Sequence, residues 1–309
     1  AILIITADPP KGHYIKSALD NSKKPVELLT LDECNHDAIK LLDLGLRVGA
    51  KLTKHISNYR REKVPFSELT IGLECGRSDP SSGLVANPLM GLIADRLIDL
   101  GGSAIIGETI EWLGAEHLLL KRAQSNKVKT KISNAVDFQR NFAKSKGIDL
   151  LGNNPGHQNI QAGLSTIEEK SIGNVAKSGS KKIQNVIDWG DQTKKNGMFL
   201  MHAPAYAPES LSGFSSASCQ MILFSTGVGN SFNNHISPTI KYSANPDACS
   251  QLNEQLDFKC SDVFLGDKLI EKSLEEFWDL IVKICAGSLT WGEILNDSSE
   301  VFSRIDRSL

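Results

Sequence analysis

One stretch in the first third of the chain constrains the fold most, because it predicts a strand, a helix and a second strand in succession. Leu69–Glu74 is typical of a buried strand, and turn-forming residues follow it. We expect Asn87 as the N-cap of the helix, Pro88 in its first turn and Gly101 at its end. Ser103–Gly107 is the second strand. This spacing predicts two parallel strands joined by a right-handed crossover helix.

The same alternation continues along the chain. Predicted strands lie at 1–6, 26–31, 197–201, 220–225 and 239–243, and predicted helices at 37–58, 111–123, 124–149, 167–177 and 273–287. We therefore expect an α/β fold with a largely parallel sheet flanked by helices. In such folds the carboxyl ends of the strands form the rim of the ligand site.

A polar crossing at 60–63, followed by Pro65, sets the expected boundary between two domains, 1–62 and 63–309. The chain opens with Ala1 inside a predicted strand, and a native chain rarely begins in mid-strand. We therefore expect that an upstream part has been removed. The last predicted helix, 273–287, is amphipathic and serves either the core or an interface in a homo-oligomer.

Composition narrows the class of protein. The net charge of −2 argues against a protein held to nucleic acid by general basic attraction. No apolar run approaches the roughly 18 residues that span a bilayer, and no export signal opens the chain. Six cysteines without a C-x-x-C pair favour a reduced, cytoplasmic protein. Neither a phosphate-binding Walker loop nor a G-x-S-x-G nucleophile turn is present.

Polar residues follow four of the predicted strands. Cys75 ends the first, with Ser78 and Asp79 close behind, and Glu108, His202 and Thr226 end or follow the others. A thiol, carboxylates and an imidazole at one rim can bind a divalent metal of the iron, manganese or zinc kind. The alternative is that strands end in polar residues simply because they end at the surface.

Two further candidates are open to two interpretations. His117 follows Glu108 by nine residues, and it is either a ligand or base at the rim or a surface histidine. The residues 163–166 lead into a predicted helix that carries Lys170. They are either an ordinary helix cap or a loop that binds a carboxylate together with Lys170.

Several sequence blocks, in order, resemble the altronate dehydratase/galactarate dehydratase family. They are Gly72–Asp79 with Ser82-Gly83 and Ala86–Pro88, Gly107–Thr109 with Gly114–His117, Gly163–Ser171, Ala203-Pro204 with Glu209-Ser210 and Ser212-Gly213, Thr226–Gly229, and Pro238–Lys241 with Ala244-Asn245. The resemblance runs from about Val26 to the C-terminus. Three positions depart from the family pattern: Arg77 stands where glycine is common, Ala162 also replaces a glycine, and His202 stands where an aspartate is expected.

The resemblance implies a metal-dependent dehydratase that converts a sugar acid such as altronate or galactarate to a 2-keto-3-deoxy acid. It implies iron(II) as the usual metal, with manganese(II) as the alternative. It also implies that 1–62 is the remainder of a middle domain, that 63–309 is the catalytic domain, and that a small N-terminal domain or subunit is a partner. A related enzyme splits sulfolactate by a similar β-elimination, so a sulfolactate sulfo-lyase type subunit is the alternative. A catalytically incomplete sugar-acid-binding fragment is the third possibility.

Dehydration next to a carboxylate needs a base for the α-proton, an acid for the leaving hydroxyl and a cation to stabilise the enediolate. We expect Cys75, Glu108 and His117 to bind the metal. The expected acid/base or carboxylate-binding groups are His202 and Lys170, with His117 as a further candidate. The expected substrate-binding residues are Ser78, Asp79, Asn87, Thr226 and Lys241.

Overall fold

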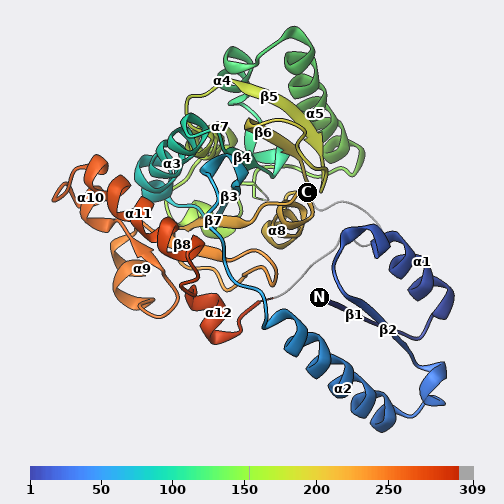
Figure 1. The fold of residues 1–309 in the computed structure, drawn as a ribbon. Coiled ribbons are helices and arrows are strands. Elements are labelled where there is room, and N and C mark those ends of the chain that lie inside the picture. The colour runs from blue at the N-terminus through green and yellow to red at the C-terminus, as the bar shows by residue number, and fades with distance from the viewer. Residues whose placement is uncertain (153, 299–309) are drawn as a thin grey trace. The chain divides into compact units, whose positions relative to one another are not determined.

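The computed structural model describes residues 1–152 and 154–298. The chain divides into two compact units between Lys63 and Val64 (Figure 1). None of the helices in the described part is long and apolar enough to cross a membrane.

The first unit is a small β-α-β-α arrangement. Its elements are β1 (Ile2–Thr6), α1 (Pro9–Leu19), β2 (Val26–Thr30) and α2 (Ala38–Ile56), and the two strands are parallel. The sequence did not predict helix α1, because two consecutive prolines, Pro9 and Pro10, are more typical of a break than of a helix. They occupy the first turn of α1, where a missing N–H does no harm, and the Asp8 carboxylate caps the helix by accepting from the Lys11 N–H at 3.1 Å.

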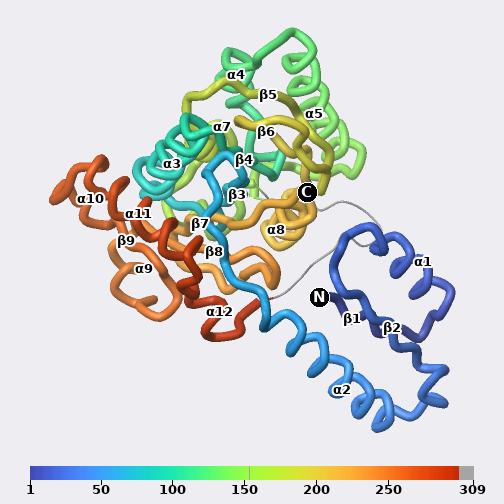
Figure 2. Tube along the Cα trace, in the orientation of Figure 1, coloured from blue at the N-terminus to red at the C-terminus, as the bar shows by residue number. Residues whose placement is uncertain are grey.

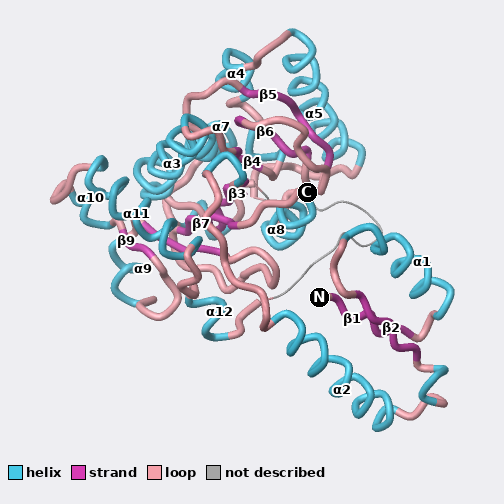
Figure 3. The backbone as a smooth tube through the Cα atoms, viewed as in Figure 1, coloured by secondary structure: helices cyan, strands magenta, loops and turns pink. Residues whose placement is uncertain are grey.

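The second unit is built on a seven-stranded sheet in the order β5-β6-β4-β3-β7-β8-β9, and every neighbouring pair is parallel. The strands are β3 (Thr70–Gly76), β4 (Ser103–Ile106), β5 (Ile183–Asp188), β6 (Gly197–His202), β7 (Met221–Thr226), β8 (Thr239–Ser243) and β9 (Phe258–Lys259). Helices surround the sheet (Figure 3). The expected α/β fold with a parallel sheet is confirmed.

Alternating strand residues divide the core into two layers. Ile71 and Leu73 of β3 pack with α3 (Asn87–Asp99), α5 (Asn126–Ser145) and α11 (Ile270–Cys285). The residues of β4, β6 and β7 that belong to the opposite face of the sheet, such as Ile105 and Phe224, pack against α8 (Ala207–Ser216). Figure 2 shows α3 and α11 next to each other. The apolar residues of α11 are buried in the first layer, so this helix contributes to the core.

The remaining helices are short: α4 (Glu116–Arg122), α6 (His157–Gln161), α7 (Ile167–Val175), α9 (Pro246–Gln251), α10 (Ser261–Leu265) and α12 (Trp291–Leu295). The expected N-cap at Asn87 is wrong. Asn87 already has helical dihedral angles, because a π-helical turn over Ser82–Ala86 runs directly into α3. Its side chain instead joins the helix to the sheet, accepting from the Ser225 hydroxyl at 2.7 Å.

Gly72 lets α8 approach the sheet closely. A Cβ at this position would lie 2.6 Å from Cγ of Phe214. We predict that Gly72→Ala lowers the free energy of unfolding by about 1–3 kcal/mol, because the core is overpacked. Chemical denaturation measures this, with Gly45→Ala as the control, since nothing lies within 4 Å of a Cβ at that helical position. An unchanged stability for Gly72→Ala would contradict the packing described.

Candidate functional site

The carboxyl ends of β6, β4, β3 and β7 lie in a row, because these strands are consecutive neighbours in a parallel sheet. Cys75 lies near the end of β3, Glu108 follows β4, and His202 and Thr226 are the last residues of β6 and β7. The four strand ends singled out from the sequence are therefore at one edge. Ligands of open α/β sheets bind at such an edge.

Three buried glutamates meet at this edge. Glu74, Glu108 and Glu111 each offer a carboxylate oxygen within 4.8 Å of the others. The Lys177 ammonium lies 2.5 Å from Oε2 of Glu111, and the Lys170 ammonium lies 3.8 Å from its Oε1. We call these five residues the carboxylate–lysine cluster. Charged groups are rarely buried without partners, so this cluster is the most unusual feature of the interior.

Burial governs the protonation of the cluster. It raises the pKa of Glu74 to about 7 and raises that of Glu108 well above its ordinary value, with neighbouring carboxylates adding to the effect. Burial opposes the charge of Lys177, but the carboxylates of Glu111 and Glu74 outweigh it and raise the pKa of the lysine. In this structure Lys177 is therefore charged, and Glu74 and Glu108 hold a proton more readily than free carboxyl groups do.

The backbone around Glu108 is strained. Glu108 has φ +47°, in the left-handed region that residues other than glycine and asparagine rarely adopt. This conformation turns the chain from β4 into a 3₁₀ turn over Thr109–Trp112, which carries Glu111. Gly107 must precede it, because a Cβ there would lie 2.3 Å from Oγ of Ser210. Strain of this kind is concentrated at functional sites.

Two of the glutamates have one fixed oxygen and one without a hydrogen bond. Oε1 of Glu74 accepts from the Cys75 N–H at 3.2 Å, and Oε2 of Glu111 accepts from Lys177. Oε2 of Glu74 and Oε1 of Glu111 are buried and have no hydrogen-bond partner among the described residues. The Ser210 hydroxyl oxygen is also buried and has no hydrogen-bond partner among the described residues.

One of the three expected metal ligands belongs to the group of converging carboxylates formed by Glu74, Glu108 and Glu111. Glu108 belongs to it, whereas Cys75 and His117 are not among the converging ligand atoms. The Cys75 thiol lies 2.8 Å from the Ser78 hydroxyl, and burial raises its pKa, so it is a neutral thiol here. His117 is exposed on α4. The assignment of Cys75 and His117 as ligands stays a prediction.

His202 and Lys170 each contact a residue of the turn after β4, Thr109 and Glu111 respectively. Nδ1 of His202 is 2.9 Å from the Thr109 hydroxyl, and that hydroxyl also accepts from the Ala203 N–H at 3.1 Å. A hydroxyl has one proton and two acceptor lone pairs, so the tautomer of the His202 ring decides which of the two groups donates. Lys170 donates to the side-chain oxygen of Asn154 and pairs with Glu111. Both groups are half-buried.

The expected substrate-binding residues are buried, and protein groups already bind them. Asp79 accepts from the Ser82 N–H at 2.9 Å and from the Asn245 amide at 2.8 Å, which joins the loop after β3 to that after β8. Thr226 accepts from the Gly229 N–H at 3.1 Å. Lys241 donates to the Asn230 carbonyl at 2.6 Å, and burial lowers the pKa of Lys241.

The loop after β3 contains a second strained residue. Arg77 has φ +54°, which favours glycine, and this accounts for the glycine common at that position in the family pattern. The neighbouring Ser78 is fixed by its carbonyl, which accepts from the Asn159 amide at 2.8 Å. Asn159 and Asn245 therefore both hold this loop in place. Ser78 and Asp79 have these positioning contacts independently of any substrate.

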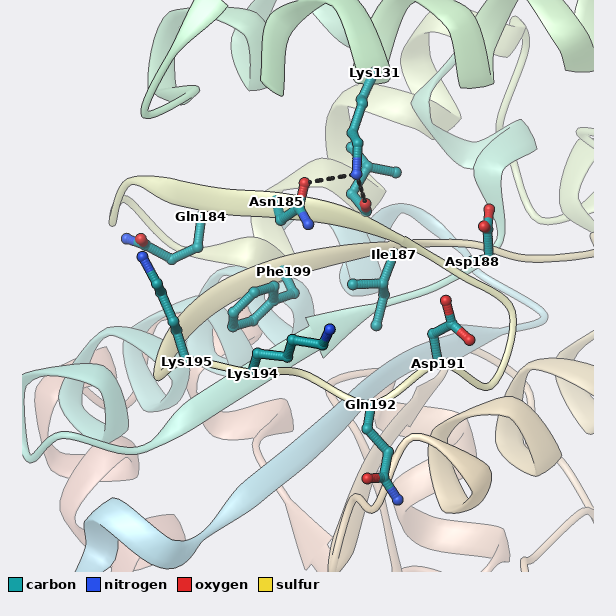
Figure 4. Close-up of a pocket in the computed structure, with 11 residues that line it drawn as sticks. Lys131, Gln184, Asn185, Ile187, Asp188, Asp191, Gln192, Lys194, Lys195 and Phe199 are labelled. Atoms are coloured by element: carbon teal, nitrogen blue, oxygen red, sulfur yellow. Dashed lines mark hydrogen bonds between the residues drawn. The ribbon is translucent and has the colours of Figure 1, made fainter. Parts of the chain in front are cut away.

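A pocket of about 450 Å³ lies elsewhere, along the edge strand β5 (Figure 4). Lys131 of α5 reaches over it but donates to the Asn185 side chain and the Val186 carbonyl, each at 3.0 Å. Its walls include none of the site residues expected from the sequence. The cluster, not this pocket, is therefore the candidate site.

Comparison with known proteins places most of the chain in one family. The family model for the C-terminal part of D-galactarate/altronate dehydratase matches residues 66–307. The altronate dehydratase of Bacillus subtilis (strain 168) is 35% identical over 281 residues, which cover 88% of this chain and 56% of that enzyme. That of Escherichia coli (strain K12) is 33% identical over 261 residues, 84% of this chain and 52% of the enzyme.

A third relative is named as a subunit. The (2R)-sulfolactate sulfo-lyase subunit beta of Chromohalobacter salexigens is 28% identical over 310 residues, which cover 100% of this chain and 79% of that subunit. The chain spans about half the length of the two altronate dehydratases.

We predict that Lys177→Met destabilises the protein by about 3–5 kcal/mol, because it leaves the Glu111 carboxylate buried without its counter-charge. Adding Glu111→Gln to this variant should restore part of the loss. Chemical denaturation measures both, with the surface variant Lys181→Met as the control, expected to cost less than about 1 kcal/mol. Equal effects at Lys177 and Lys181 would contradict the account of the cluster.

Proposed function

Since this chain belongs to the D-galactarate/altronate dehydratase family, we propose that it is the catalytic part of a metal-dependent dehydratase that converts a sugar acid to a 2-keto-3-deoxy acid. The observation that carries the proposal is the carboxylate–lysine cluster, all five members of which lie inside the matched region 66–307. Altronate and galactarate are the candidate substrates, since relatives are named for them.

The reaction removes a proton from the carbon next to a carboxylate and expels the hydroxyl group from the neighbouring carbon. The first step builds negative charge on the carboxylate as the enediolate forms, so the site must supply positive charge there. The second step needs a proton donor near the leaving oxygen. A buried cluster of ammonium and carboxyl groups offers both kinds of group within a few ångströms.

We assign the binding of the substrate carboxylate to Lys170, whose half-buried ammonium is held near the edge by Asn154 and Glu111. Proton transfer is assigned to His202, because the Thr109 hydroxyl fixes the orientation of its ring. The rings of His202 and Phe138 form a T-shaped contact with centroids 5.1 Å apart, which orients the imidazole further. The imidazole replaces the carboxylate expected from the family pattern, so we expect a changed preference among sugar acids.

The donor set suits a metal. Oε2 of Glu74 and Oε1 of Glu111 are buried without hydrogen-bond partners among the described residues, and Glu108 lies beside them. A divalent cation bound there supplies the charge that stabilises the enediolate. Within the protein, Lys177 pairs with Glu111, and the turn after β4 fixes the spacing of Glu108 and Glu111.

A lyase of the sulfolactate type is the second candidate, and one observation favours it: the similarity to the sulfo-lyase subunit extends over the whole chain. Because that relative is named a beta subunit, we also propose that a second subunit or a further domain completes the enzyme. A sugar-acid-binding fragment without turnover is the third candidate.

In the test, the chain is purified anaerobically and supplied with iron(II). It is then incubated with altronate, galactarate and sulfolactate in three separate reactions. We predict a 2-keto-3-deoxy acid from one of the sugar acids, detected by NMR. His202→Ala should lower kcat by about 10²–10⁴-fold if it transfers the proton. The control is His55→Ala in the other unit. Sulfite from sulfolactate alone would favour the second candidate, and binding without product the third.

A further inference from the structure

We propose that the guanidinium of Arg77 binds a second anionic group of the substrate, a carboxylate or a sulfonate at the end away from the reacting carboxylate. The chain therefore prefers acids with two anionic groups, such as galactarate or sulfolactate, to acids with one, such as altronate. This deepens the proposed function and rests on it for the identity of the reaction, whereas binding of the second anion needs no turnover.

The first argument is the position of Arg77. It follows directly after β3, which lies between β4 and β7 in the sheet, so its backbone is at the edge that holds the candidate site. Its carbonyl accepts from the Gly227 N–H of the loop after β7 at 3.2 Å. The carbonyl of the next residue, Ser78, accepts from the Asn159 amide. The backbone that carries the guanidinium is therefore fixed before any ligand binds.

The second argument is the strain of this residue. Arg77 has φ +54°, where a side chain is costly and glycine is not. The described residues of the second unit that share a left-handed backbone without being glycine are Arg77, Glu108, Ser218 and Asn296. The two charged ones follow β3 and β4, which are paired neighbours. A glycine would relieve the strain at residue 77, so the local fold gives no reason for an arginine, and its side chain has another role.

The third argument is that the guanidinium is available to a ligand. Arg77 is exposed, and its side chain makes no hydrogen bond or ion pair within the described part of the chain. The carboxylate nearest in sequence, Asp79, is already engaged. It accepts from the Ser82 N–H at 2.9 Å and from the Asn245 amide at 2.8 Å. An arginine held in this way can form two parallel hydrogen bonds to the oxygens of one anionic group.

The second anion needs a cation of its own, because the lysines of the site are engaged. Lys177 and Lys170 both pair with Glu111, and Lys170 is already assigned to the reacting carboxylate. Lys241 donates to a backbone carbonyl, and burial lowers its pKa. Arg77 is the remaining candidate among these cations.

The segments that carry Arg77 and Lys170 pack against each other. A Cβ on Gly83, at the end of the loop after β3, would lie 3.3 Å from Cα of Gly173 in α7. A Cβ on Gly163, in the loop before α7, would lie 3.6 Å from Pro80. The loop after β3 and the helix that carries Lys170 thus border the same part of the edge. An acid with an anionic group at each end suits two cations arranged in this manner.

Two departures from the family pattern change the charge of the edge in the same direction. Arg77 stands in place of a neutral glycine, and His202 stands in place of an anionic aspartate. Even with a neutral imidazole, the edge is therefore two charge units more positive than the pattern would make it. A more positive edge favours a substrate that carries more negative charge.

The experiment compares the binding of galactarate, sulfolactate and altronate to the anaerobic chain supplied with iron(II), by isothermal titration calorimetry. In Arg77→Gly we expect about 10–100-fold weaker binding of the preferred acid with two anionic groups, the loss of one charge-assisted pair. Altronate should bind within about threefold of its affinity for the unchanged chain. The stronger ligand of galactarate and sulfolactate identifies the second anion as a carboxylate or a sulfonate.

Glycine suits the left-handed backbone, so this variant should fold, which circular dichroism checks. The matched control is Lys23→Gly, because Lys23 is also an exposed cation with a left-handed backbone, φ +56°, but belongs to the first unit. It should leave all three affinities unchanged. Arg77→Lys keeps the charge without the planar fork and should give an intermediate loss. Where product forms, Arg77→Gly should raise KM more than it lowers kcat.

The proposal is overturned if Arg77→Gly weakens the binding of all three acids equally, or of none. It is also overturned if the unchanged chain binds none of them, or binds altronate as tightly as the better of the other two. Binding of an acid with two anionic groups that depends on Arg77 but yields no product would remove the proposed function and leave the proposal standing. A 2-keto-3-deoxy acid from altronate alone would support the proposed function and overturn the proposal.

Discussion

The ion pair between Lys177 and Glu111 is the interaction on which the rest of the site depends. Both side chains are buried, and an isolated charge in such a place would be strongly disfavoured. The ammonium also attracts Glu74 and Glu108, so one cation allows three carboxylates to share the edge of the sheet. Lys177 comes from the short turn after α7, and this packing therefore links the helical layer to the carboxyl ends of β3 and β4.

The loops around this centre are held by polar contacts that reach far along the chain. Asp79 joins the loop after β3 to Asn245, and the carbonyl of Ser78 accepts from Asn159. Asn87 connects the start of α3 to β7 through the Ser225 hydroxyl. Such contacts fix the positions of the strand ends, which is what a site that must hold a reactive intermediate requires. The sequence blocks that resemble the family pattern thus hold the edge of the sheet in shape, in addition to any contact with a ligand.

The sequence predicted the parallel sheet well, because strands such as Met221–Thr226 are continuous apolar runs between turn residues. It missed β5, whose strand Ile183–Asp188 carries Gln184 and Asn185 and lies at the sheet edge. It also missed α8, where serines and a glycine replace the usual apolar stripe. In both cases tertiary packing, not local propensity, decides the structure.

The site was predicted in part. Glu108 was recognised as a strand-end carboxylate, and Lys170 as a cation near the rim. Glu74 was missed, although a carboxylate inside an apolar strand had to be paired, and this signal was present in the sequence. Lys177 gave no such signal, because its contact with Glu111 spans 66 positions and depends on the packing of the helices against the sheet.

The central claim is that the buried carboxylates of Glu74, Glu108 and Glu111 hold the cation of a dehydratase site. An anomalous-difference map from crystals grown with Mn²⁺ tests it most directly. The account predicts one strong peak bounded by these three side chains, with the Lys177 ammonium still on Glu111. A peak on the Cys75 sulfur and the His117 ring, or no peak at the edge of the sheet, would contradict it.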